Sequence, residues 1–93
     1  MKKAEKEHLA RVASLGCIVC RNLGFFETPA TIHHIRAGQG MGQRASHNEV
    51  IPLCPGHHQH GGHGVAIHAG QKIFEAKYGT EEQLLEQVRE LLA

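Results

Sequence analysis

Two short motifs in this sequence each carry a pair of potential metal ligands. They are Cys17-x-x-Cys20 and, much further along the chain, Cys54-x-x-His57. Two intervening residues let both side chains of a pair reach one ion from a single tight turn, and three thiolates with one imidazole form a typical structural zinc site. We predict such a zinc site here, with His58 as the alternative to His57. In a competing interpretation the three cysteines are buried small apolar residues and His57 lies on the surface.

The sequence also contains nine histidines, most of which fall in two groups. One is the pair His33-His34, and the other is the run of histidines from His57 to His68. Imidazoles are common ligands for transition metals and can act as general bases near neutral pH. In a regular strand, adjacent residues point to opposite faces, so His33 and His34 could serve one site only if the strand were distorted. The alternative is a solvated His-rich loop that binds metals incidentally.

Composition indicates why a metal would be needed. The chain has 93 residues, 4% aromatic residues and no Trp, so we expect a single domain with a small hydrophobic core. Such domains usually need additional stabilisation, for example from a bound metal ion or disulfides. A structural zinc ion contributes roughly 10–16 kcal/mol to the folding of zinc-finger peptides. The absence of Asp argues against a calcium site, which is normally built from several Asp.

The charge distribution permits an anionic partner. The net charge is +1, with Lys and Arg in excess over residues 1–69 and Glu in excess over residues 70–93. No apolar run approaches the roughly 18 residues of a membrane span, and no secretory leader is recognisable. We therefore expect a cytoplasmic protein, with no membrane association, whose cysteines are reduced thiols rather than disulfides.

Local patterns predict helices at both ends of one domain spanning residues 1–93. The first part is predicted to be a helix over 3–15 that stops at Gly16, followed by a knuckle turn over 17–22. Strands over 30–35 and 49–53 follow, joined by a Gly-rich loop over 37–46, and then one helical turn at most within 56–64. The last part is predicted to be a helix over 71–78 that ends at Gly79 and a final helix after a capping box at 80–83. These divide into an N-terminal helix (1–15), a knuckle and core (17–68) and two C-terminal helices (70–92). The leucine stripe over 84–92 is expected to pack on the core, which favours a monomer over a dimer.

The order of these motifs resembles the HNH (ββα-metal) endonuclease superfamily. The resemblance covers about residues 15–80. It rests on the Cys17-x-x-Cys20 knuckle, His33-His34-Ile35, the block from Val50 to Gln59 and the segment from Val65 to His68. A finer match, to the phage RecA-dependent recombination-enhancement nucleases, includes Phe74 to Gly79. The resemblance implies a small α+β, treble-clef-like ββα-metal domain and a metal-dependent DNA endonuclease of phage or prophage origin that works in a bacterial cell.

The same resemblance implies roles for individual histidines. His34 would be the general base that takes a proton from the water attacking a DNA phosphate. His33 and His58 would be ligands of a catalytic metal ion. A third ligand would be His68, displaced by an insertion after His58, or its rival His60.

The middle position of the HNH motif is open between two neighbours. The superfamily Asn usually lies five residues before the zinc Cys, where this chain has Glu49. Asn48 is one place away, and a one-residue slip in a strand reverses the facing side unless a bulge corrects it. His47 would share a face with Glu49. Either residue could orient the base.

Cofactor and partner expectations follow from this interpretation. The active site would use Mg²⁺, Mn²⁺ or Zn²⁺, in addition to the structural Zn²⁺. DNA, in a RecA–DNA filament for the finer family, would be the partner, and Arg36, Gln43 and Arg44 around the Gly-rich loop could contact phosphates. Two competing functions are a zinc-stapled module that binds nucleic acid without cutting it, and a metal carrier that holds several nickel or zinc ions weakly.

Overall fold

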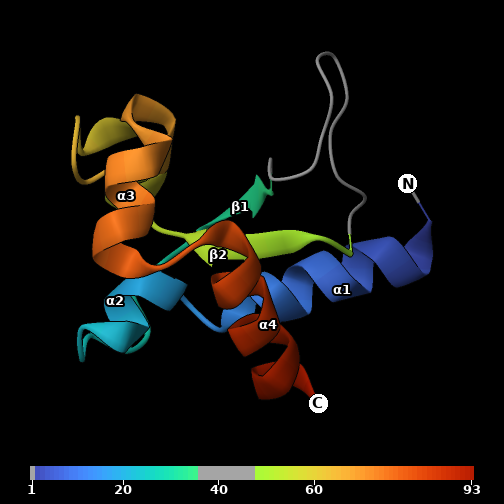
Figure 1. Cartoon of the computed structure of the whole chain (residues 1–93). Helices are drawn as coiled ribbons and strands as arrows, with labels where there is room; N and C mark the ends of the chain where they lie inside the picture. The colour runs from blue at the N-terminus through green and yellow to red at the C-terminus, as the bar shows by residue number, and fades with distance from the viewer. Residues whose placement is uncertain (1, 36–47) are drawn as a thin grey trace.

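The computed structural model describes residues 2–35 and 48–93 as a mixed α/β domain around a two-stranded antiparallel sheet. In chain order the elements are α1 (Lys3–Ser14), α2 (Ile18–Asn22), β1 (Thr31–His34), β2 (Val50–Leu53), a π-helical turn (Gly56–His60), a 3-10 turn (Ile67–Ala69), α3 (Gln71–Tyr78) and α4 (Glu81–Leu92). Helices α1 and α4 cross beside the sheet, and α3 stands with the two turns at the end where β2 finishes (Figure 1). The predictions for residues 36–47, including Arg36, Gln43, Arg44 and His47, lie outside the described residues.

Strand β2 is the centre of the core. All four of its residues are buried, and α1, α2 and α4 contact it. Its partner β1 is buried only at His33. A strand that is apolar at every position is typical of burial on both faces. Strand β2 fits this pattern, because it pairs with β1 and helices α1, α2 and α4 contact it.

The C-terminal helix supplies much of the remaining apolar surface. Leu84, Leu85 and Val88 of α4 are buried in the same core cluster as Val12 of α1 and Phe74 of α3. The Arg11 guanidinium donates to the Leu92 carbonyl (2.8 Å), which joins the two long helices at the end of α4. The predicted leucine stripe therefore packs within the domain through Leu84, Leu85 and Val88, while Leu91 at its far end is exposed.

Helix boundaries follow the local signals closely. Helix α4 begins with the predicted capping box, in which the Gln83 N–H donates to Thr80 Oγ1 (3.1 Å) and the Thr80 N–H donates to Gln83 Oε1 (2.9 Å). Helix α1 ends before Gly16, whose φ of 74° lies in the left-handed region. A Cβ there would lie 3.0 Å from the Thr28 carbonyl oxygen, so this sharp turn into the first cysteine motif requires glycine.

Four predicted segments differ in detail from the structure. Each strand is shorter than predicted, because Ala30, Ile35 and Glu49 lie outside the paired ladder. The first cysteine motif is a short helix after Cys17 rather than only a turn. The Gly-rich stretch after β2 forms a π-helical turn, closed by a bond from the Gly61 N–H to the Gly56 carbonyl (2.9 Å). None of the described helices is long and apolar enough to cross a bilayer.

Candidate metal centres

Two groups of potential metal ligands flank the end of β2. The first, here called the Cys3His cluster, consists of Cys17, Cys20, Cys54 and His57. The second, called the three-histidine cluster, consists of His33, His58 and His68. Within each group the ligand atoms all lie within 4.8 Å of one another.

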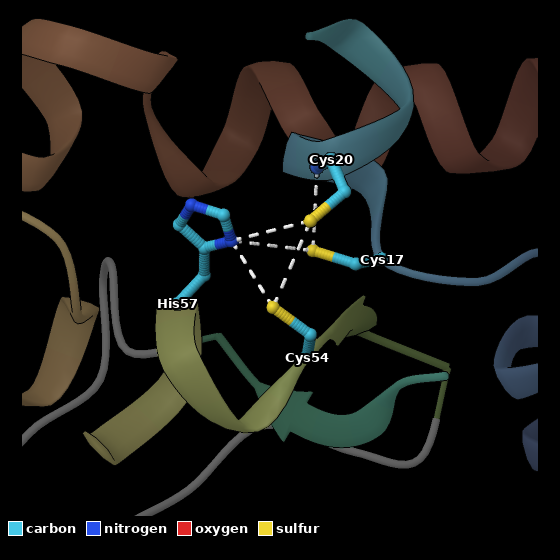
Figure 2. A group of neighbouring side chains, drawn as sticks. All are labelled: Cys17, Cys20, Cys54 and His57. Carbon is cyan, nitrogen blue, oxygen red and sulfur yellow. Dashed lines mark hydrogen bonds between the residues drawn. The ribbon is translucent and has the colours of Figure 1, made fainter. Parts of the chain in front are cut away.

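Short helical turns on both sides place the Cys3His ligands. Cys17 is the N-cap of α2, so its Sγ accepts from the Cys20 N–H (3.4 Å) while the Cys20 thiol projects from the first turn. Cys54 follows β2 directly, and His57 lies three residues later in the π-helical turn. Figure 2 shows the three sulfur atoms and His57 Nδ1 turned toward a common centre between these two segments.

The distances between these ligand atoms suit a tetrahedral ion. His57 Nδ1 lies 3.7, 3.6 and 3.2 Å from the Sγ atoms of Cys17, Cys20 and Cys54, and the Cys20 and Cys54 sulfur atoms are 3.8 Å apart. Tetrahedral zinc with Zn–S of about 2.3 Å and Zn–N of about 2.0–2.1 Å needs ligand separations of about 3.5–3.8 Å. Three of the four separations lie in this range, and the contact between Cys54 and His57 is shorter. The cluster could therefore hold a metal ion, and its ligand types are those of structural zinc.

Electrostatics in this cluster explain why an ion and its ligands depend on each other. Burial raises the pKa of the Cys17 thiol to about 12, so without a cation this thiol stays protonated at neutral pH. Burial, and then the nearby Lys77 ammonium, lowers the pKa of His57 and keeps its ring neutral, as a ligand must be. A divalent ion at the centre would supply the positive charge that stabilises the thiolates.

The three-histidine cluster is assembled from three separate segments. His33 comes from β1, His58 from the π-helical turn and His68 from the 3-10 turn. The His58 and His68 Nε2 atoms lie 2.9 Å apart, and the His33 ring meets both of the other rings edge to face with centroids 5.0 Å away. His33 is buried, His58 partly buried and His68 exposed, so the cluster opens toward solvent on one side.

Neutral imidazoles are the ligating form, and the surroundings of His58 favour that form. Burial, followed by the charges of the neighbouring imidazoles, lowers the pKa of His58 to about 4. Its ring is therefore uncharged at neutral pH. Three imidazoles whose ligand atoms lie within 4.8 Å of one another could hold a divalent transition metal with open positions left over.

The structure separates several residues that the sequence had grouped. His57 is in the Cys3His cluster and His58 is not, although the sequence left both possible. His60 is exposed and belongs to neither cluster, whereas His68 is placed beside His33 and His58. The π-helical turn and the 3-10 turn together return the chain to this point after the His- and Gly-rich segment between them.

His34 and Asn48 lie near the clusters without belonging to them. The pairing of β1 with β2 is regular from Thr31 to His34, so alternation directs His33 and His34 to opposite faces. His34 is partly buried, and Asn48 is exposed just before β2.

Sequence reasoning missed Glu81, the first residue of α4. Its carboxylate is 0% exposed, and its Oε2 lies 2.6 Å from His33 Nε2. An acid in the first turn of a helix normally faces solvent and complements the helix dipole. Nothing in the local sequence distinguishes Glu81 from the exposed Glu82 beside it, so only the tertiary structure reveals its contact.

These observations define a small mixed α/β domain with a two-stranded sheet and a Cys/His cluster that could hold a metal ion. The model of the family described as "Recombination enhancement, RecA-dependent nuclease" matches residues 2–93. The chain therefore belongs to this family. Membership indicates a nuclease, an enzyme acting on DNA, with a role in recombination.

Proposed function

We propose that the chain is a metal-dependent HNH endonuclease that hydrolyses DNA phosphodiester bonds, with the three-histidine cluster as its metal-binding active site. The observation that carries this proposal is the convergence of three imidazoles from three segments, with one side open to solvent. The order of two strands followed by a helical turn also agrees with a ββα-metal arrangement. The four-ligand Cys3His cluster, by contrast, suits a structural ion.

The proposed chemistry divides between the ion and the protein. An ion held by His33, His58 and His68 would supply a Lewis acid for the developing charge on a phosphate. The protein must supply a base. His33 is 2% exposed with Nε2 engaged by Glu81, so it is poorly suited to taking a proton from water.

We assign the role of general base to His34. It is partly accessible and adjacent to the proposed ligand His33. Because the two rings leave opposite faces of β1, we propose that the phosphate binds at the end of this strand, where side chains from both faces can approach it. His34 would accept the proton of the attacking water there.

The pairing of the strands supports Asn48 as the residue that orients His34. His34 pairs with Val50 at the end of the ladder, and just beyond this pair the Ile35 N–H donates to the Glu49 carbonyl (3.0 Å), which keeps the two chains side by side. Two residues before Val50, Asn48 falls on the face of His34, where diagonal neighbours are within side-chain reach. His47, which lies outside the described residues, is the second candidate for this role.

DNA contacts outside the clusters complete the proposal. Arg36, Gln43 and Arg44 are proposed to bind phosphates. Because the family is described as a RecA-dependent nuclease, we also propose DNA within a RecA filament as the substrate. The ion at the active site is proposed to be Mg²⁺, Mn²⁺ or Zn²⁺, and the site of action to be the cytoplasm of a bacterial cell carrying a phage or prophage.

Plasmid cleavage tests the proposal directly. Supercoiled plasmid is incubated with Mg²⁺ or Mn²⁺, with and without a RecA–DNA filament, and with the wild type, His34→Ala or His8→Ala. His8 lies on α1 and belongs to neither cluster, so its replacement controls for loss of an imidazole. We expect His34→Ala to lose at least 100-fold in cleavage rate, the scale of general-base catalysis, and His8→Ala to match the wild type. DNA binding without cleavage under every condition would instead establish the non-catalytic binding module.

A further inference from the structure

The buried carboxylate of Glu81 links α4 to the three-histidine cluster through His33 and to α3 through Gln71. Its Oε2 lies 2.6 Å from His33 Nε2, and its Oε1 accepts from Gln71 Nε2 (3.0 Å). Acidic side chains are almost never fully buried unless they are paired. The position at the start of the 12-residue helix α4 favours the ionised carboxylate, because the N-terminus of a helix carries partial positive charge.

An ionised Glu81 determines which nitrogen of His33 carries the proton. A carboxylate can only accept, so His33 must donate through Nε2–H. In a neutral imidazole the other nitrogen then has a lone pair, and for His33 this is Nδ1. The nitrogen that bears no proton is the one that can bind a metal ion.

Thr31 determines the proton position of His58 by a parallel argument. Its hydroxyl donates to the Leu53 carbonyl (3.0 Å), which can only accept. A hydroxyl has one hydrogen, so Thr31 Oγ1 must accept in its 3.0 Å contact with His58 Nδ1. His58 therefore carries its proton on Nδ1 and offers the lone pair of Nε2, the atom that lies 2.9 Å from His68 Nε2.

We propose that Glu81 and Thr31 are positioning residues that hold His33 and His58 in opposite tautomers, so that His33 Nδ1 and His58 Nε2 both present lone pairs to one divalent cation. This inference rests on the proposed metal site at the three-histidine cluster. Partners of this kind fix the ring orientation of a ligating histidine and strengthen it as a ligand.

The tautomers can be measured in the wild-type protein. Long-range ¹H–¹⁵N correlation spectra are recorded on zinc-loaded protein with no second ion, at about pH 8, where free imidazoles are neutral. We expect Nε2–H for His33 and Nδ1–H for His58. The opposite tautomer at either ring would overturn the assignment for that residue. This measurement needs no variant, so it is decisive even if a substitution impairs folding.

Metal affinity tests whether these contacts matter to the site. Binding of Mn²⁺ or Co²⁺ to the zinc-loaded protein is measured by calorimetry for Glu81→Gln and for Glu82→Gln, which removes the same charge from the exposed neighbour. Thr31→Val is compared with Thr28→Val, whose hydroxyl contacts the Phe25 carbonyl (3.4 Å). We expect Glu81→Gln and Thr31→Val to bind the second ion roughly 10–100-fold more weakly, and both controls to bind it like the wild type. Zinc content should be the same in all four variants.

The outcomes separate this inference from the function on which it rests. If the wild type binds a second ion and Glu81→Gln binds it as tightly as Glu82→Gln does, Glu81 has no positioning role while the metal site stands. If the wild type binds no second ion, the proposed active site itself fails, and the positioning role fails with it. Loss of zinc in Glu81→Gln would show a role in folding and overturn a specific role at the second site.

Discussion

The Cys3His cluster and the three-histidine cluster are served by consecutive residues, His57 and His58, yet they are built differently. The first takes four ligands from two short motifs, and its three cysteines are buried. The second takes three ligands from three segments and leaves His68 exposed. Four ligands close a tetrahedral ion, whereas three leave room for water or substrate. This difference is the basis of our proposal that the first cluster would hold a structural ion and that the second would take part in the chemistry.

The largest effect is expected when one ligand is removed from the Cys3His cluster, the proposed structural centre. We expect Cys54→Ser to abolish high-affinity zinc binding and cooperative thermal unfolding. A structural zinc ion is worth roughly 10–16 kcal/mol, which is comparable to the whole stability of a small domain, about 5–15 kcal/mol. Metal analysis and circular dichroism measure both effects, and a chelator should unfold the wild type in the same way. A folded Cys54→Ser protein would show that the domain does not need an ion at the Cys3His cluster in order to fold.

Removal of a ligand from the three-histidine cluster should have a different result. We expect His68→Ala to keep its zinc and its fold but to bind the second ion at least 100-fold more weakly, because two imidazoles remain of three. His60→Ala is the matched control, since His60 is an exposed histidine of the π-helical turn that lies outside both clusters. Calorimetry with Mn²⁺ measures the affinities. Equal losses in the two variants would indicate diffuse binding to a His-rich segment.

The pH dependence of stability should also report on the second cluster. The folded pKa of His58 is lowered to about 4, from 6.5 for the free side chain. Between these values the unfolded chain binds the proton and the folded chain does not, so stability falls as pH decreases from 6.5 to 4 and the loss is complete below 4.

Replacement of His58 measures how much of this decrease in folding stability is due to protonation of His58. The full shift corresponds to roughly 3 kcal/mol, and solvent screening at this partly exposed ring should reduce the loss to about 1–2 kcal/mol. We expect His58→Gln to lose less stability over this range than the wild type does, in denaturant titrations without added second ion. Parallel stability curves for the two proteins would exclude a lowered pKa at His58.

The smallest expected effect concerns the start of α4. Thr80→Ala removes the capping hydroxyl and should cost about 1 kcal/mol, the usual value for such caps. Because α4 carries Glu81 toward His33, we also expect a weakening of the second ion of less than tenfold, with zinc content unchanged. Thr28→Ala provides the comparison for loss of a threonine hydroxyl elsewhere. Unchanged stability in Thr80→Ala would show that the capping box contributes little.

Local sequence signals predicted the elements near the clusters well. The bounds of α3, the capping box of α4 and the grouping of Cys17, Cys20, Cys54 and His57 all agree with the structure, because each depends on residues close in sequence or on a fixed ligand spacing. The strand predictions were one residue too long at most ends. Strand ends depend on pairing with a distant partner, which periodicity alone does not report.

The arrangement of the second cluster was only partly accessible from sequence. The choice between His60 and His68 depended on how an irregular Gly-rich segment folds back, and no local propensity fixes this. The Glu81 contact joins residues 48 positions apart, so its sequence neighbourhood gives no indication of it. The roles of His34, Asn48 and His47, and of the residues around the Gly-rich loop, remain predictions for the experiments above.

The π-helical turn has a consequence for how the protein would acquire its metals in a cell. His57 and His58 share this five-residue turn, which is closed at Gly61, where a Cβ would clash with the Gly56 carbonyl oxygen. An ion bound by His57 would immobilise the same short segment that presents His58. We therefore expect the two metals to bind in order, zinc first. When zinc is scarce, the three-histidine cluster would not form however abundant its own metal is, so the supply of zinc would govern the use of the second metal.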